Sequence, residues 1–332
     1  MPRLIYPSPD DTVSTHTGIQ TEFIKRIGKN GTESALEWLL PIKNNCECSY
    51  PENLTIRFET DVLPPYEIII SEAQDLTRGV KYLTDSPSLT LTNLKVGWEY
   101  FVFISGELVG KIKTADEKFR FVKIDGLLNV RDLGGIKIKQ GMIYRGSDIM
   151  GEYNITDVGK DTFSCKLGIK TELNLRKETS PDRISPLTSI PHIYLPYRPY
   201  MEIFEEEHKQ GISEIFDFLS DENNYPIYFH CLGGADRTGM IALYLRALLG
   251  ESDEDILTDY ELTSLSTYAG GLTEGIDAQG FRSRNSDYFV KFLAALSKYS
   301  DKNELRFSVP AFLAECGVKE ETLEKIISIL KK

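Results

Sequence analysis

Short runs of apolar, β-branched and aromatic residues recur through the first 116 positions and are separated by turn-forming residues. Runs of this length and spacing are typical of the strands of a β-sandwich. The clearest runs are 54–58, 66–70, 89–94, 98–104 and 108–112. Only residues 105–107 separate the last two, so they should form a hairpin. We therefore predict an all-β sandwich domain over residues 1–116.

After a polar linker at residues 114–118, the pattern changes to helices that alternate with strands. Helical patterns cover 157–167, 211–219, 237–249, 289–298 and 320–331, and strand patterns cover 170–175, 190–195 and 226–230. Such alternation indicates helices packed around a mainly parallel sheet. We predict a second domain, of the α/β class, over residues 117–332.

Composition narrows the classes of function. The 332 residues include 38 Lys and Arg against 50 Asp and Glu, for a net charge of −12. Nucleic acids and anionic membranes are bound through Lys and Arg, so neither is an expected partner. No run approaches the roughly 20 apolar residues that span a bilayer, and the N-terminus does not resemble a signal peptide. We expect a cytoplasmic protein, or a secreted one if a signal segment has been removed.

The five cysteines form no regular framework, and their odd number argues against a disulfide-stapled scaffold. Cys46 and Cys48 form an isolated C-x-C without a second pair of ligands, and the chain has only four histidines, so a zinc site is not expected. We expect free thiols at Cys46, Cys48, Cys165 and Cys316, and neither a metal nor another cofactor.

Residues 226–239, with the sequence PIYFHCLGGADRTG, carry the clearest chemical signal. A strand runs into a loop that starts at Cys231 and ends at Arg237, and a long apolar helix follows. A glycine-containing loop at a helix N-terminus can turn successive N–H groups toward one tetrahedral anion. We predict that a phosphoryl group is bound by the loop residues Leu232, Gly233, Gly234, Ala235, Asp236 and Arg237. Arg237 would hold two phosphoryl oxygens in a bidentate fork.

The same positive environment would favour the thiolate form of Cys231. A thiolate beneath a bound phosphoryl group can attack in line, and water would then hydrolyse the phosphocysteine. Thr238 could donate its hydroxyl to the sulfur when the thiolate leaves, and His230 would orient the start of the loop. A buried cysteine before a glycine-rich turn is the structural alternative, but the whole pattern of strand, His-Cys, paired glycines and Arg-Thr-Gly favours catalysis.

The loop resembles the HCxxGxxR[ST]G signature of the protein tyrosine phosphatase superfamily. The segments NVRDLGG at 129–135 and YRGS at 144–147 are similar to motifs of its bacterial and fungal tyrosine and phosphoinositide phosphatases. The resemblance extends from about residue 119 to the C-terminus. It implies that Cys231 is the nucleophile and Arg237 the phosphate ligand, and it matches Asp236 to the Asp that precedes the Arg in the family.

Two residues depart from the pattern of these relatives. Ala235 stands where the family usually has a Lys that is associated with phosphoinositide headgroups, so we expect a weaker lipid phosphatase activity. Gly146 stands where the family has a Ser after Tyr-Arg.

In the first domain, residues 93–100 resemble the region before the penultimate strand of fibronectin type III domains. There a Leu, a Gly turn and a Tyr build a tyrosine corner. An ordinary strand with a core tyrosine would explain the same residues nearly as well.

The general acid is less evident. Many relatives place an Asp on a loop after a strand, but residues 196–202 contain no Asp. The candidates are Asp236, Glu202 and Asp132. Asp236 could instead shape the loop by accepting hydrogen bonds. Arg131 and Asp132 could form a buried pair that braces it.

We therefore predict a phosphatase of phosphate monoesters that acts through a phosphocysteine on phosphotyrosine or phosphoserine/threonine peptides. Phosphoinositides or other small phosphate esters are the alternative substrates. An inactive phosphate-binding module is disfavoured because Cys231 and Arg237 are both intact. Sulfur transfer by a rhodanese-like loop is disfavoured because the Asp-Arg-Thr-Gly sequence that follows the glycines fits phosphatases far better. The β-domain could bind a partner, shape the active-site rim or serve as a spacer.

Overall fold

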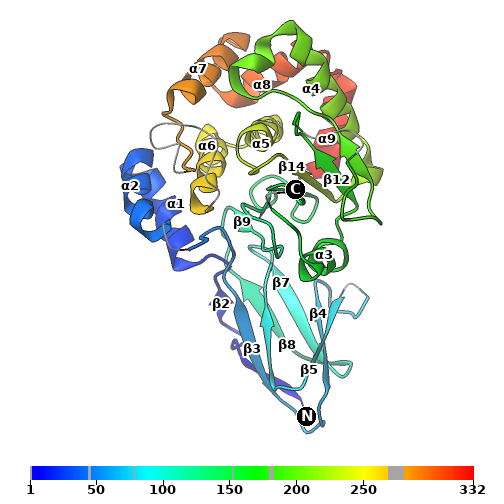
Figure 1. The fold of residues 1–332 in the computed structure, drawn as a ribbon. Helices are drawn as coiled ribbons and strands as arrows, with labels where there is room; N and C mark the ends of the chain where they lie inside the picture. The colour runs from blue at the N-terminus through cyan, green and yellow to red at the C-terminus, as the bar shows by residue number, and fades with distance from the viewer. Residues whose placement is uncertain (1, 44–45, 78, 152, 179–182, 268–279) are drawn as a thin grey trace. The chain divides into compact units, whose positions relative to one another are not determined.

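The computed structural model describes the whole chain except residues 1, 44–45, 78, 152, 179–182 and 268–279. The chain forms two compact units, each described by itself below (Figure 1). The β unit comprises Met1–Thr17 and Pro51–Val122, and the α/β unit comprises Gly18–Tyr50 and Lys123–Lys332. The chain therefore passes from one unit to the other three times.

The β unit contains two sheets that share one apolar core. Their strand orders are β1–β3–β6 and β2–β8–β7–β4–β5. The strands of this unit are β1 (Arg3–Tyr6), β2 (Thr12–Val13), β3 (Leu54–Glu59), β4 (Tyr66–Ser71), β5 (Gly79–Thr84), β6 (Ser88–Leu91), β7 (Glu99–Ile104), β8 (Glu107–Thr114) and β9 (Arg120–Phe121). Every second residue of β3 is buried, as expected for a strand with one face in the core. The predicted hairpin is confirmed, because β7 and β8 pair in antiparallel fashion.

Tyr100 in β7 is buried, and its hydroxyl accepts a hydrogen bond from Lys95 N (2.7 Å). A bond from a core phenol to the chain a few residues upstream is the contact of a tyrosine corner. The turn between them contains Gly97 with a φ of +57°, and a Cβ there would lie 2.8 Å from Asp116 Oδ1. These contacts support the resemblance to fibronectin type III domains, which stays a prediction.

The prediction of an all-β segment over residues 1–116 is wrong for residues 18–43. Two helices, α1 (Gly18–Asn30) and α2 (Thr32–Lys43), lie between β2 and β3 in the sequence and belong to the α/β unit. Each buries a stripe of residues spaced three or four apart, which stabilises an amphipathic helix by tertiary packing. The buried apolar residues are Phe23, Ile27, Ala35, Leu36 and Leu39. We call residues 18–50 the helical insertion.

The α/β unit is built around strands in the order β13–β12–β14–β11–β10. The central strand β14 (Ile227–His230) runs parallel to β12 (Thr171–Asn174) on one side and to β11 (Ile143–Gly146) on the other. The outer strand β13 (His192–Tyr194) is parallel to β12, whereas β10 (Arg131–Asp132) is antiparallel to β11. The mainly parallel sheet predicted for this part of the chain is thus present.

Helices cover this sheet, and those predicted at 157–167, 211–219, 237–249, 289–298 and 320–331 are all present. The α-helices after the insertion are α3 (Asp157–Asp161), α4 (Glu206–Leu219), α5 (Asp236–Leu248), α6 (Asp253–Glu261), α7 (Asp287–Leu296), α8 (Leu305–Glu315) and α9 (Glu320–Leu330). The shorter helical turns are η1 (Thr162–Lys166), η2 (Tyr200–Phe204), η3 (Glu222–Asn224), η4 (Leu262–Leu265) and η6 (Ser297–Tyr299). Among the described helices, none is long and apolar enough to cross a membrane.

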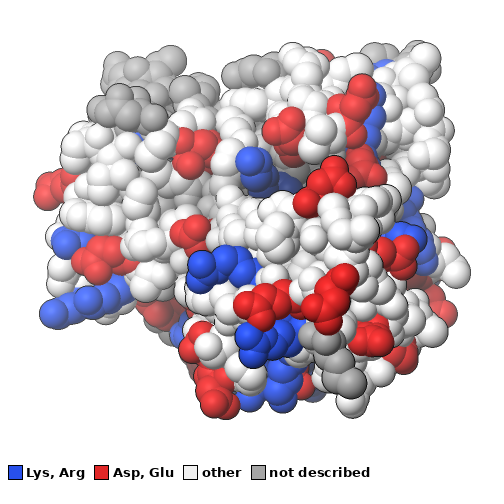
Figure 2. Space-filling view, turned by 90° about the horizontal axis from the view of Figure 1, so that it is seen from below, with Lys and Arg blue, Asp and Glu red and all other residues white. Residues whose placement is uncertain are grey.

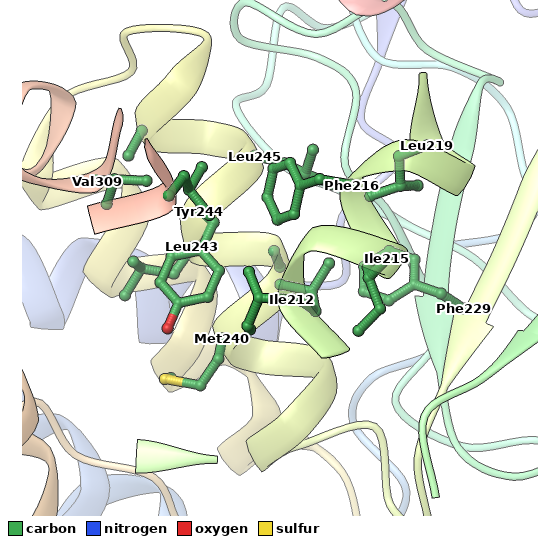
Figure 3. Packing of buried hydrophobic residues seen from close by; sticks show 14 of the residues in the cluster. Ile212, Ile215, Phe216, Leu219, Phe229, Met240, Leu243, Tyr244, Leu245 and Val309 are labelled. Atoms are coloured by element: carbon green, nitrogen blue, oxygen red, sulfur yellow. The ribbon is translucent and has the colours of Figure 1, made fainter. Parts of the chain in front are cut away.

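Helix α5 lies in the middle of the core and is buried along most of its length. Figure 3 shows its side chains Met240, Leu243 and Tyr244 packed among residues of α4 and Val309 of α8. A helix fixed in this way presents its N-terminus in a defined position, directly after β14. On the face that Figure 2 shows, acidic side chains separate the basic ones, so the described residues form no extended positive area there.

Candidate active site

The loop predicted to bind phosphate connects the end of the central strand to the start of the buried helix. β14 ends at His230 and α5 begins at Asp236, so residues 231–235 lie between them. Ligands of parallel sheets bind at the carboxyl ends of the strands, and a helix N-terminus favours an anion. Cys231, the first residue of this loop, is only 3% exposed.

Three successive carbonyls of the loop each accept a hydrogen bond from another segment. The donor and acceptor pairs are Asp148 N to Leu232 O (2.8 Å), Asn129 Nδ2 to Gly233 O (3.0 Å) and Arg145 Nη2 to Gly234 O (2.7 Å). In a planar trans peptide the N–H points opposite to the carbonyl. The N–H groups of residues 233–235 therefore face the other side of the loop, as an anion-binding nest requires.

Close packing against β11 explains the glycines at two positions. Gly234 has a φ of +68°, and a Cβ there would lie 2.4 Å from the backbone of Gly146. A Cβ at Gly146 would in turn lie 2.4 Å from the hydroxyl of Tyr228, which donates to Ser147 O (2.6 Å). The space that a serine would need at position 146 is thus taken by Tyr228, which accounts for the departure from the family pattern.

A buried network of charges lies behind the loop. Asp259 accepts hydrogen bonds from Arg131 Nε (3.2 Å) and from Arg145 Nη1 (2.6 Å), and all three side chains are at most 2% exposed. Burial alone would raise the pKa of Asp259, but the charges of Arg246, Arg131 and Arg145 outweigh it and hold the pKa well below its usual range. The network fixes Arg145, which anchors Gly234.

Arg131 and Asp132 do not pair with each other, so that hypothesis is wrong. Arg131 pairs with Asp259 and also donates to Asn129 Oδ1, and Asn129 is one of the side chains that anchor the loop. The Asp132 carboxylate accepts from the backbone N–H groups of Gly134 (2.7 Å) and Gly141 (2.6 Å). Asp132 therefore closes the turn between these two glycines.

His230 is fully buried and fixes the start of the loop. Its Nε2 lies 3.0 Å from Glu172 Oε1, and its Nδ1 lies 3.2 Å from the carbonyl of Cys231. Burial would raise the pKa of Glu172, but the hydrogen bond and charge of His230 outweigh it and lower that pKa. These contacts support the predicted orienting role of His230.

Thr238 lies in the first turn of α5. Its hydroxyl is buried and has no hydrogen-bond partner among the described residues. Leaving a buried hydroxyl without a partner typically costs about 1–3 kcal/mol. Donation from Thr238 to the Cys231 sulfur stays a prediction.

The Arg237 side chain is held by an acidic residue that the sequence analysis missed. Arg237 Nη1 donates to Glu178 Oε2 at 2.7 Å, and Glu178 is 57% exposed. Burial would lower the pKa of Arg237, but Cys231 and Glu178 outweigh it and raise that pKa. The structure thus brings Cys231, Arg237 and Glu178 together. Glu178 follows β12, which lies directly beside the motif-carrying strand β14 in the sheet.

Asp236 is held by two side chains from distant parts of the chain. Arg282 donates to both of its oxygens (2.8 and 3.1 Å), and the Tyr200 hydroxyl also donates to Oδ1. Burial would raise the pKa of Asp236, but the charge and hydrogen bonds of Arg282 outweigh it and lower that pKa. A carboxylate with a lowered pKa and both oxygens occupied is a poor proton donor.

The structure also locates the third candidate acid, the loop alanine and the four other cysteines. Glu202 in η2 is exposed, and its Oε2 lies 3.4 Å from Arg198 Nε. Ala235 is 1% exposed and precedes α5. Cys46, Cys48, Cys165 and Cys316 are all free thiols, and the Cys46 and Cys48 sulfurs lie 3.1 Å apart.

One loop at the N-terminus of α5 thus carries a buried cysteine, a series of N–H groups turned away from its anchoring segments, and Arg237, whose pKa Cys231 helps to raise. That arrangement defines a cysteine-dependent phosphatase. Residues 122–332 match the model of the tyrosine phosphatase family, which covers more than half of the chain. The chain therefore belongs to the tyrosine phosphatase family and is a phosphoric monoester hydrolase, and the resemblance drawn from the sequence is confirmed.

Two solved structures show weak similarity. One is the core catalytic domain of the PP-IP phosphatase SIW14 from S. cerevisiae in complex with citrate, at 21% identity and a TM-score of 0.30. The other is the Siw14 catalytic core, at 22% identity and the same TM-score. Each match covers 37% of this chain and 73% of the other. At this TM-score the similarity carries no argument about function. No curated protein matches the chain.

Proposed function

We propose that the protein hydrolyses phosphotyrosine in peptides or proteins through a phosphocysteine intermediate. The observation that carries the proposal is the burial of Cys231, which is 3% exposed at the base of the loop. A phosphoryl group on a long, flat aryl stem reaches such a base more readily than one on the short side chain of serine or threonine. Ala235 supports the same preference, because it supplies no cation for additional phosphates of an inositol ring.

In the proposed reaction, the substrate dianion binds the N–H groups of the loop and takes the Arg237 guanidinium from Glu178. The Cys231 thiolate attacks phosphorus, the S–P bond forms, and the bond to the leaving oxygen breaks. Water then attacks the phosphocysteine and releases inorganic phosphate and the thiolate. The contacts to the transferring group are charged hydrogen bonds, which are strongest where charge accumulates.

We propose Glu178, rather than Asp236, as the group that protonates the leaving oxygen. Burial would raise the pKa of Glu178, but its hydrogen bond and charge contact with Arg237, together with the charge of Arg176, outweigh burial and lower that pKa. A bound phosphate would take away the Arg237 contact and would bring a negative charge close to Glu178. Both changes favour the protonated carboxyl. For Asp236 the contacts to Arg282 and Tyr200 support the loop-shaping role instead.

The proposal is tested with purified protein on an aryl phosphate, a phosphotyrosine peptide, a phosphoserine peptide and a soluble phosphoinositide. We expect the highest kcat/KM on the aryl and phosphotyrosine substrates and no turnover by Cys231→Ser on any of them. A higher kcat/KM on the phosphoinositide would refute the substrate assignment and favour a lipid or small-ester phosphatase. Wild-type inactivity on the whole panel, with oxyanion binding intact, would favour a phosphate-binding module.

We also propose that the β unit is a fibronectin type III-like domain. Two features support this proposal: the order of the strands in the two sheets, and the hydrogen bond from Lys95 N to the Tyr100 hydroxyl. Replacing Tyr100 by Phe would remove that one contact, and we expect a lower unfolding temperature for this unit.

A further inference from the structure

One buried arginine connects the phosphate loop to a segment outside it. Arg282 is fully buried and donates to both oxygens of Asp236. Its own backbone is also fixed, because Arg282 N donates to Ser264 Oγ (2.9 Å) and Ser264 Oγ donates to Arg282 O (3.2 Å). The position of this arginine, and of the loop carboxylate that it holds, depends on residues 281–285.

Helix α2 of the helical insertion holds the residues on both sides of that arginine. Glu33 accepts hydrogen bonds from Ser283 Oγ (3.0 Å) and Asn285 Nδ2 (2.8 Å). Lys43 Nζ lies 4.5 Å from the ring centroid of Phe281, within range of a cation–π contact. One helix thus contacts the segment before and after the residue that reaches the loop.

A third contact joins the same helix to the end of α6. Thr32 Oγ1 donates to Glu261 Oε1 (2.7 Å), and Arg284 Nε donates to the same oxygen (2.9 Å). Thr32 and Glu261 are both buried. Hydrogen bonds in a water-excluded network are stronger than exposed ones, so this network makes the junction rigid.

We propose that α2 is a positioning element of the active site and that Glu33 sets the Arg282–Asp236 pair. A bidentate pair between guanidinium and carboxylate is directional, so its geometry follows the backbone that carries the arginine. A shift of residues 281–285 would move Asp236, which directly precedes the phosphate ligand Arg237. The inference rests on the proposed role of residues 231–237 as the phosphate site, and it makes the helical insertion part of that site.

The test compares Glu33→Ala with Glu37→Ala in the full chain. Glu37 is exposed on the same helix and makes no hydrogen bond or ion pair with the described residues. We expect Glu33→Ala to weaken tungstate binding, measured by calorimetry, by about 2- to 5-fold. An effect of this size is at the lower end of the coupling free energies between residues of one network, because Glu33 itself is exposed to solvent. We expect Glu37→Ala to bind as the wild type does.

The Asp236→Asn background separates positioning from general stabilisation. In this background the charged pair with Arg282 is lost, so adding Glu33→Ala should not weaken tungstate binding further. Unchanged binding in Glu33→Ala alone, or an equal additional loss in Asp236→Asn, would overturn the inference. If Glu33→Ala does not fold, Ser283→Ala and Asn285→Ala each remove one donor and permit the same comparison. Failure of the wild type to bind tungstate would instead refute the proposed phosphate site.

Discussion

Replacing Asp259 by Asn should test the buried network behind the phosphate loop. Asp259 is 2% exposed and is the carboxylate that Arg131 and Arg145 share, whereas Arg246 also pairs with Glu251. Removing one partner of a buried ion pair typically costs about 3–5 kcal/mol, because the remaining charge is left without compensation. For a unit of this size each 1 kcal/mol lowers Tm by roughly 2–4 °C. We therefore expect Tm to fall by about 6–20 °C.

The effect should also depend on pH. The folded-state pKa of Asp259 is depressed, so its stabilisation is present above the unfolded pKa, which is about 3.9 for Asp. That stabilisation is lost as the pH falls through the depressed folded value. The difference in Tm between wild type and Asp259→Asn should therefore be constant near neutral pH and shrink below about pH 4.

Thermal unfolding followed by circular dichroism measures both effects. Glu324→Gln is the control, since Glu324 is exposed on α9 and makes no hydrogen bond or ion pair with the described residues. If Asp259→Asn lowers the free energy of unfolding by less than about 1 kcal/mol, the network contributes no more than a surface ion pair does, and the reasoning is refuted. A loss in kcat/KM should accompany the instability, because Arg145 anchors Gly234.

Three further predictions concern the site itself. Cys231→Ser should abolish turnover and retain vanadate binding, whereas Arg237→Ala should lose both; substantial turnover by Cys231→Ser would contradict the covalent mechanism. Glu178→Gln should slow the hydrolysis of phosphate esters with poor leaving groups more than that of activated aryl phosphates, and it should flatten the alkaline limb of the pH–rate profile. Equal slowing of both kinds of substrate would mean that another residue is the general acid. Gly146→Ala should destabilise the fold through the clash with the Tyr228 hydroxyl, and Tyr228→Phe in the same chain should restore part of Tm. If Tm is not restored, the contact with Val130 Cγ2, 2.9 Å from the same Cβ, is the dominant clash instead.

The catalytic loop could be predicted because its chemistry is local in the sequence. Cys231, the paired glycines and Arg237 lie within seven positions, and the spacing itself encodes a turn at a helix N-terminus. The elements of the α/β unit could also be predicted, since each carries its own apolar periodicity.

The supports of the loop could not be predicted, because they are long-range. Arg282 and Tyr200 reach Asp236 from 46 and 36 positions away. Nothing in the local pattern says whether Asp236 has such partners, so its acid and loop-shaping roles could not be separated. The acidic residues Asp259 and Glu178 were missed for the same reason.

The helices of residues 18–43 were missed for a different reason. Their stripe of apolar residues was present in the sequence, at Phe23, Ile27, Leu36 and Leu39. The strands on either side suggested one continuous β-domain, and the chain instead leaves that unit and returns to it.

The helical insertion has a consequence for dissecting the protein. A truncated chain that begins at residue 117 matches the domain border suggested by the sequence, yet it would lack α1 and α2. It would expose the surfaces of Glu261 and residues 281–285 that those helices cover. A protease cut at residues 114–118 would likewise leave the β unit joined to the α/β unit through residues 17–18 and 50–51. An independent catalytic fragment therefore has to carry residues 18–50 on a designed linker to Lys123.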